Sequence, residues 1–267
     1  MASFLTRLLQ RSLGDDASGV EMTFFDHLED LRRQIVKALV GFLLATIVCV
    51  VFSDFIVSTL LLSPVRAVGM KLQVLSPYGK VMMYMETVLF AGFVVSMPWI
   101  LYCLWRFVAP GLMPRERRYI SLTVAFTSLC FFAGVAFGYF ILVPAALSFF
   151  STFGDPSIEL HIAVDQYVSF LLALIVGAGL VFELPMISFF LTKMGLLSPA
   201  FMRKYRRHAI VVILIVAAVV TPTPDMVTQA LLAMPMFVLY EVSILVSMFA
   251  QRKRKAAEPA EPEGTEE

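Results

Sequence analysis

The chain has 267 residues, of which 59% are hydrophobic and 15% are charged, and its formal net charge is +1. A soluble domain has roughly 25% charged residues, whereas several uncharged runs here exceed about 20 residues, the length that an α-helix needs to cross a bilayer. These features exclude a soluble globular protein. They also exclude a membrane barrel, whose strands have about 10 residues of alternating polarity. We therefore predict an all-α polytopic membrane protein.

The chain begins with an N-terminal extension, residues 1–22, for which an interfacial helix and disorder are both compatible with the sequence. Thr23 is a candidate N-cap for an amphipathic helix that leads into the first span. Glu29 and Arg33, four residues apart on this helix, can pair. Asp30 has no such partner, because its neighbour four residues on is Gln34.

Six apolar segments are candidate spans, at about 35–53, 84–107, 120–150, 166–192, 209–221 and 226–249. The third would be about 46 Å long as a helix, so it must tilt or project beyond a hydrocarbon core of about 30 Å. The fifth would be only about 20 Å long, which indicates a re-entrant segment or, as we favour, a locally thinned bilayer. Residues 23–250 are thus predicted to form a six-helix membrane domain. Residues 251–267 are predicted to be a disordered tail, first basic and then acidic.

The basic residues predict the orientation of the spans. Of the 21 Lys and Arg residues, 18 fall in the N-terminal region, the even-numbered loops and the C-terminus, and three in the first odd-numbered loop. Because basic loops stay in the cytoplasm, both termini are predicted to be cytoplasmic. The first outer loop, about 54–80, is expected to lie across the outer surface as short helices.

No catalytic or metal-binding pattern is present. The sequence lacks nucleophile–base, zinc-protease and phosphate-loop motifs, and its three histidines are scattered. Cys49, Cys103 and Cys130 lie within apolar segments and outside any C-x-x-C, which favours buried small side chains. We expect no enzymatic activity, no metal, no cofactor and no nucleic-acid partner.

Glu183 is the one carboxylate in the fourth apolar segment. An ionised side chain at the bilayer centre costs roughly 2.5–3.5 kcal/mol on insertion scales. Pro185 increases the local polarity, because it cannot donate a helix hydrogen bond to the Val181 carbonyl. Glu183 is therefore predicted to be functional. The alternative is a protonated carboxyl that hydrogen-bonds a neighbouring helix and contributes only packing.

Asp30 and Glu116 are two acids on the basic side of the membrane. A pair of carboxylates suits two guanidinium ions, because a carboxylate binds arginine through two hydrogen bonds whereas lysine offers a point charge. The alternative for Glu116, which lies among arginines, is an ordinary surface ion pair.

Five strings, in order, resemble one family. They are His27–Arg33 (HLEDLRR), Trp105–Leu112 (WRFVAPGL), Glu116–Arg118 (ERR), Phe182–Pro185 (FELP), and Thr221–Asp225 (TPTPD) with Thr228 and Gln229. Together they resemble the TatC family, the receptor subunits of the twin-arginine protein translocase, over about residues 23–249.

The resemblance implies a cup-shaped fold of six transmembrane helices with short fifth and sixth helices, in the bacterial cytoplasmic (inner) membrane. It implies a receptor and assembly core that binds the Arg-Arg signal peptides of folded proteins, whose export the proton gradient drives. The implied partners are TatA- and TatB-type single-span subunits, further copies of the chain, and the lipid bilayer.

The resemblance also implies roles for particular residues. Signal-peptide binding would fall to Asp30, Glu116, Arg32, His27, Leu28 and Phe107. The groove that receives a partner helix would be lined by Glu183, Gln229, Pro185 and Asp225, and Pro64 would lie in the outer cap. The family usually has Glu where this chain has Asp30, which is about one methylene shorter.

One alternative function belongs to a different class. A proton-coupled secondary transporter could use Glu183 and Glu241 as relay carboxylates. Such transporters commonly contain internal repeats and paired broken helices, and this sequence shows neither.

Overall fold

The computed structural model of the chain describes residues 24–109, 120–155, 161–221 and 226–257. The predictions for residues 1–22 and for the acidic end of the tail lie outside these ranges. The first half contains α2 (Phe24–Val51), α3 (Ser53–Phe55), the π-helix η1 (Ile56–Leu61), α4 (Ser63–Val68), β1 (Lys71–Gln73) and α5 (Gly79–Val108). The second half contains α7 (Ile120–Phe137), the π-helix η3 (Gly138–Leu142), α8 (Val143–Thr152), β2 (His161–Ala163), α9 (Val164–Val181), α10 (Leu184–Lys193), α11 (Pro199–Lys204), α12 (Arg206–Val220) and α13 (Met226–Ala257).

The all-α membrane architecture is confirmed. Within the described ranges, five helices are long and apolar enough to cross a bilayer, and they correspond to the predicted spans one to four and six. The fifth predicted span is α12, whose 15 residues give a length of about 22 Å. α12 is thus as short as the sequence predicts.

Two predictions about the C-terminal part are wrong. The sixth helix, α13, is not short but has 32 residues. It also continues past residue 250 to Ala257, so the first part of the predicted disordered tail is helical. The physical reason is that the basic run after Gln251 consists of Arg, Lys and Ala, which are strong helix formers and extend the helix beyond the apolar segment.

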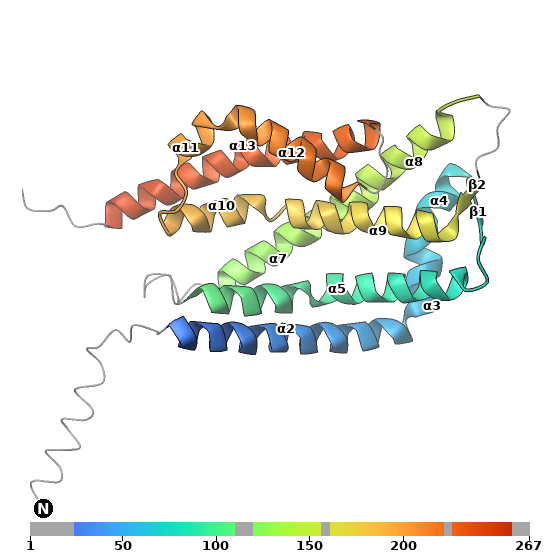
Figure 1. Cartoon of the computed structure of the whole chain (residues 1–267), viewed down its shortest axis with the longest axis horizontal. Helices are drawn as coiled ribbons and strands as arrows, with labels where there is room; N and C mark the ends of the chain where they lie inside the picture. The colour runs from blue at the N-terminus through green and yellow to red at the C-terminus, as the bar shows by residue number, and fades with distance from the viewer. Residues whose placement is uncertain (1–23, 110–119, 156–160, 222–225, 258–267) are drawn as a thin grey trace, which may run out of the picture.

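Figure 1 shows how the long helices are arranged. α2 and α5 lie side by side along one edge, and α9 and α10 follow one another along the middle. α7, η3 and α8 form one long segment that runs obliquely across the bundle, as its length predicts, and α12 and α13 cover the remaining edge. The start of α2 and the ends of α5 and α13 share one end of the bundle, opposite the short strands.

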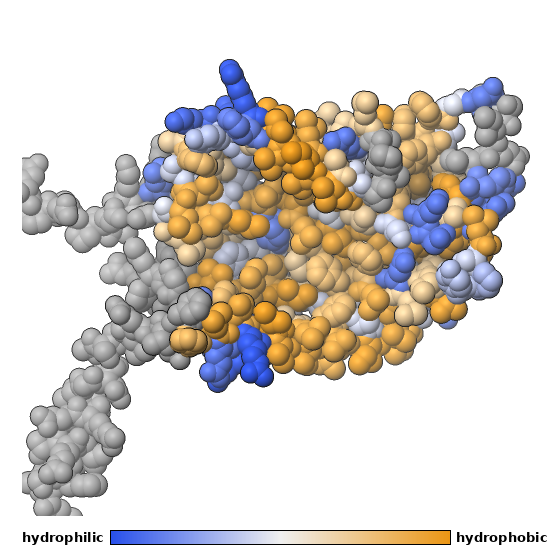
Figure 2. Space-filling view, in the orientation of Figure 1, coloured by the Kyte–Doolittle hydropathy of each residue, from blue (hydrophilic) through white to orange (hydrophobic). Residues whose placement is uncertain are grey.

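The surface is apolar between two polar ends. Figure 2 shows a broad hydrophobic band around the middle of the visible face, with hydrophilic residues at both ends. α2 contributes strongly to this band, since only 6% of the residues in its most apolar stretch are buried inside the protein. This distribution is that of a protein surrounded by lipid.

Close helix packing fixes the crossing of α7 on α9. A Cβ atom added to Gly134 would lie 2.6 Å from the carbonyl oxygen of Ala178 and 2.9 Å from the Cα of Gly179. Gly138, one turn on, lies similarly close to Ile175. Small residues allow helix backbones to approach one another in membranes, and here they determine where the oblique segment crosses.

The predicted short helices of the first outer loop are confirmed as α3, η1 and α4. They form a cap with β1, which pairs in parallel with β2 so that Leu72 lies opposite Ile162. The carbonyls of Leu60 and Leu61 end η1 and lack helical partners. The hydroxyl of Tyr139 donates to the first at 3.0 Å, and that of Tyr167 donates to the second at 2.7 Å.

Candidate functional site

The first candidate site lies where α2 begins and α5 ends. The imidazole of His27 stacks on the ring of Phe107, with centroids 4.4 Å apart and planes inclined by 19°. These residues are distant in sequence but meet because α2 and α5 pack side by side. Leu28 and Arg32 lie on exposed positions of the same helix.

Asp30 is half-buried beside this stack and forms neither a hydrogen bond nor an ion pair with the described residues. Its neighbour Glu29 differs, since Glu29 Oε1 accepts a hydrogen bond from Arg33 Nη2 at 2.6 Å. The predicted Glu29–Arg33 pair is therefore confirmed, although so exposed a pair contributes little to stability. Glu116, the other predicted carboxylate, lies outside the described ranges.

The second candidate site is the interruption of the fourth span. α9 ends at Val181 and α10 begins at Leu184, so Phe182 and Glu183 form a turn. The turn lies where Pro185 lacks the N–H that a continuous helix would require at Val181. Within the turn, the Glu183 N–H donates to the Leu180 carbonyl, three residues earlier, at 3.1 Å.

The side chain of Glu183 is buried, with 6% of its surface exposed. Its Oε1 atom has no hydrogen-bond partner among the described residues. The packing alternative requires such a bond to a neighbouring helix, and this oxygen makes none within those ranges. A buried carboxyl oxygen without a hydrogen bond is costly in an apolar environment. A donor from a binding partner would remove this cost, so the free oxygen is what we expect of a binding site.

The other residues predicted for the groove and the cap do not form one cluster with Glu183 through any described hydrogen bond. Gln229 Nε2 donates to the Leu214 carbonyl at 2.9 Å and thereby links α13 to α12. Pro185 is half-buried in the first turn of α10, and Pro64 is buried in the first turn of α4 within the cap. Asp225 lies outside the described ranges.

Glu241 does not have the surroundings of a relay carboxylate. Its Oε2 accepts a hydrogen bond from Arg206 Nη2 at 2.6 Å, joining α13 to the start of α12. The side chains are 35% and 49% exposed respectively. Sequence reasoning missed this pair because Arg206 and Glu241 are 35 positions apart, and only the antiparallel packing of α12 on α13 brings them together.

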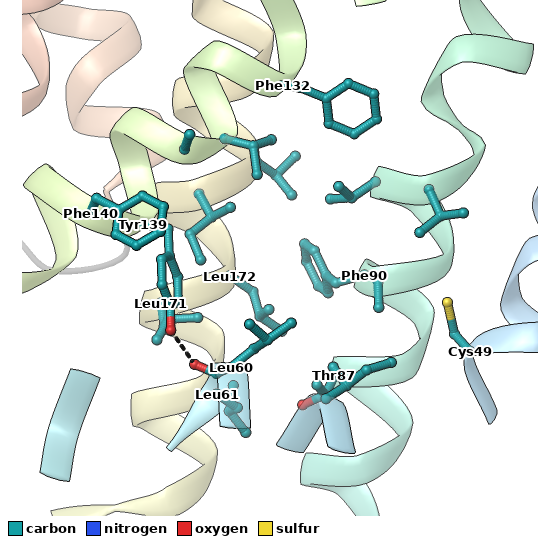
Figure 3. Close-up of a pocket in the computed structure, with 18 residues that line it drawn as sticks. Cys49, Leu60, Leu61, Thr87, Phe90, Phe132, Tyr139, Phe140, Leu171 and Leu172 are labelled. Atoms are coloured by element: carbon teal, nitrogen blue, oxygen red, sulfur yellow. Dashed lines mark hydrogen bonds between the residues drawn. The ribbon is translucent and has the colours of Figure 1, made fainter. Parts of the chain in front are cut away.

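An apolar cavity of about 410 Å³ lies between α5, α7, η1, η3 and α9. Figure 3 shows Phe90, Tyr139 and Leu172 around it. Its polar atoms are satisfied within the protein: Thr87 donates to the Met83 carbonyl at 2.6 Å, and Tyr139 to Leu60. The cavity can hold apolar groups but offers no catalytic side chain. No cluster of three metal-ligand side chains occurs in the part of the chain that was described.

Comparison with known proteins gives consistent matches. The family model for the Sec-independent protein translocase protein TatC matches residues 26–235. A Sec-independent protein translocase protein TatC from Carboxydothermus hydrogenoformans is 35% identical over 237 residues, which cover 89% of this chain and 97% of the relative. One from Helicobacter pylori is 39% identical over 221 residues, covering 83% and 85%.

A solved structure agrees with these matches. The crystal structure of a twin arginine translocase receptor, TatC, superposes with a TM-score of 0.77 at 32% identity, covering 85% of this chain and 100% of that one. The residues matched by the family model, 26–235, include both candidate sites.

Proposed function

Since the chain belongs to the TatC family of Sec-independent protein translocase proteins, we propose that it recognises Arg-Arg signal peptides with Asp30 and Glu116. The chain is a multi-pass membrane protein and a component of the twin-arginine translocase. It acts as the receptor and assembly core for folded proteins that carry such peptides. Its role is binding rather than catalysis.

The observation that carries this proposal is the contrast between Asp30 and Glu29. Glu29 is neutralised by Arg33, whereas the half-buried Asp30 has no partner among the described residues. A carboxylate without a cation can accept two parallel hydrogen bonds from a guanidinium group. The stack of His27 on Phe107 provides a rigid aromatic surface beside it.

A peptide-retention assay tests the receptor role. The purified protein should retain an Arg-Arg signal peptide at least 10-fold better than its Lys-Lys variant, because a hydrogen bond to a charged group contributes about 1.5–3 kcal/mol and lysine cannot bind in the bidentate manner. Asp30→Asn should reduce Arg-Arg retention to a similar extent.

Glu29→Gln is the matched control, since it removes one carboxylate from the adjacent position of the same helix. It should change retention less than 2-fold. Equal retention of the Arg-Arg and Lys-Lys peptides would contradict the receptor role.

We further propose that Glu183, with Gln229, Pro185 and Asp225, receives the helix of a TatA- or TatB-type single-span subunit. The unsatisfied Oε1 of Glu183 supports this role. Further copies of the chain complete the assembly, and the proton gradient supplies the energy for export. The bacterial cytoplasmic membrane is the proposed location, with both termini in the cytoplasm, as the distribution of basic residues favours.

The transporter alternative is not supported. The family to which the chain belongs is one of protein translocases, and Glu241 is held in an ion pair with Arg206. A relay through Glu183 and Glu241 therefore has no basis in the structure.

A further inference from the structure

A second cavity lies between α2 and α5, separate from the one described above, and its wall is largely apolar. Its volume is about 540 Å³. It is lined by Gln34, Lys37, Trp99, Tyr102, Cys103 and Arg106. α2 and α5 lie side by side here, towards the end of the bundle where α2 begins (Figure 1).

The wall of this cavity is rigid because Trp99 is fixed on three sides. Its Nε1–H donates to the Lys37 carbonyl at 2.9 Å. Its indole lies against Gly41, where a Cβ atom would collide with the ring. Its other neighbour is the ring of Tyr102, with centroids 5.7 Å apart. The cavity is thus a built feature of the helix pair.

Two basic residues line the cavity. They are Lys37 and Arg106, and neither forms an ion pair with a described carboxylate. Arg106 Nη1 donates to the Tyr102 hydroxyl at 3.1 Å, which leaves that hydroxyl its own proton to donate. No Asp or Glu is among the lining residues. The site therefore combines two exposed cations with a largely apolar wall, a combination that suits an amphiphilic anion.

We propose that this cavity binds the phosphate of an anionic phospholipid with a hydroxyl-bearing headgroup, of the phosphatidylglycerol class. Basic pockets between membrane helices bind such headgroups. Lys37 and Arg106 bind the phosphate, together with the Tyr102 hydroxyl. A twin-arginine peptide does not fit, because its guanidinium groups would be repelled by the same two cations.

The unpaired Oε1 atom of Gln34 specifies the headgroup. It is buried and has no partner among the described residues, and because a phosphodiester has no proton to offer it, a headgroup hydroxyl such as that of glycerol must donate. The exposed face of α2 favours a lipid over dissolved phosphate. Val40, Leu44 and Ile47 are exposed beyond the cavity, where acyl chains can lie along the helix.

Lipid titration of the full-length, delipidated protein followed by native mass spectrometry tests the proposal. Phosphatidylglycerol should bind at least 10-fold more tightly than phosphatidylcholine with the same acyl chains. The double variant Lys37→Gln/Arg106→Gln should lose about 25-fold in phosphatidylglycerol affinity, since each basic residue near an anionic membrane surface contributes roughly 5-fold.

The matched control is Lys204→Gln/Arg207→Gln, which removes the same charge from exposed positions of α11 and α12. It should change the affinity less than 2-fold. Lys37→Arg/Arg106→Lys keeps both charges and should retain binding, which separates loss of charge from loss of folding.

Equal affinity losses in the two Gln double variants would overturn the proposal, as would equal binding of the two lipids. Complete displacement of the lipid by millimolar inorganic phosphate would also overturn it, because the site would then belong to a dissolved anion. The proposal is independent of the peptide-binding function, so either can fail alone.

Discussion

Glu183 combines burial, an unsatisfied oxygen and a position at a helix interruption. Another carboxylate within a span, Glu86 of α5, lacks this combination. Glu86 is half-buried and accepts a hydrogen bond from the Ser169 hydroxyl at 3.4 Å. Two carboxylates of one bundle thus have different environments, and only Glu183 has a buried oxygen that still requires a donor.

Glu183→Ala should weaken assembly with single-span partner subunits about 10-fold, because a hydrogen bond to a buried carboxyl group is lost. It should leave the retention of Arg-Arg peptides nearly unchanged. Co-purification of the partner subunits and the peptide-retention assay, run on the same preparation, measure both effects.

Glu86→Ala serves as the control for removing a carboxylate from a span, and assembly should persist in it. A Glu183→Ala protein that lost peptide retention but kept its partners would refute this division of roles.

Sequence reasoning singled out Glu183 because the cost of a carboxylate in an apolar run is visible without a structure, and the structure adds its burial and its unpaired oxygen. It failed for Glu241, whose partner Arg206 is identified only by the packing of α12 on α13. It also missed Glu86, which lies near the start of α5, and the Lys37–Arg106 cavity, whose members come from two helices. A residue that is unusual in its own segment can be recognised from the sequence, whereas contacts between residues from distant segments cannot.

Among the helical elements, η1 depends on two tyrosines from other segments. Tyr167 of α9 is almost fully buried, and its hydroxyl donates to the Leu61 carbonyl at 2.7 Å. Tyr167→Phe should lower the free energy of unfolding by about 1–3 kcal/mol, because a buried carbonyl loses its donor. Thermal unfolding in detergent measures this loss.

The control is Tyr78→Phe, since Tyr78 is 63% exposed. It should leave the unfolding temperature unchanged. Equal stability of the two variants would show that the cap does not depend on the tyrosine hydroxyl.

The lengths of the elements were predictable where they follow hydrophobicity and not where they follow helix propensity. The oblique third segment and the short α12 agree with their apolar runs. α13 exceeds its apolar run because the basic residues beyond it are good helix formers. The β1–β2 pair could not be predicted, since each strand has only three residues, too few to show the alternation of apolar and polar residues that marks a strand.

The whole molecule has two chemically distinct ends, and its proposed orientation can be tested directly. Ser151 of α8 and Lys204 of α11 are exposed at opposite ends of the bundle. In intact cells, a membrane-impermeant maleimide should label Ser151→Cys, whereas Lys204→Cys should react only after lysis, because the proposed orientation places the basic end in the cytoplasm.

The native cysteines provide a low background, since Cys49 and Cys103 are buried and Cys130 is half-buried. The parent protein is the control for their labelling. The reverse labelling pattern would contradict the orientation proposed from the basic residues.

The two tyrosine contacts of the cap also constrain the order in which the protein can mature. Leu60 and Leu61 precede their partners, Tyr139 and Tyr167, by 79 and 106 residues. At synthesis rates of about 5–20 residues per second, Tyr167 follows Leu61 by roughly 5–20 s. Until the third and fourth spans are inserted, these two carbonyls lack their final donors. The cap is therefore among the first parts of the chain to be made, but its docking must wait until the fourth span, which ends at Lys193, has been synthesised.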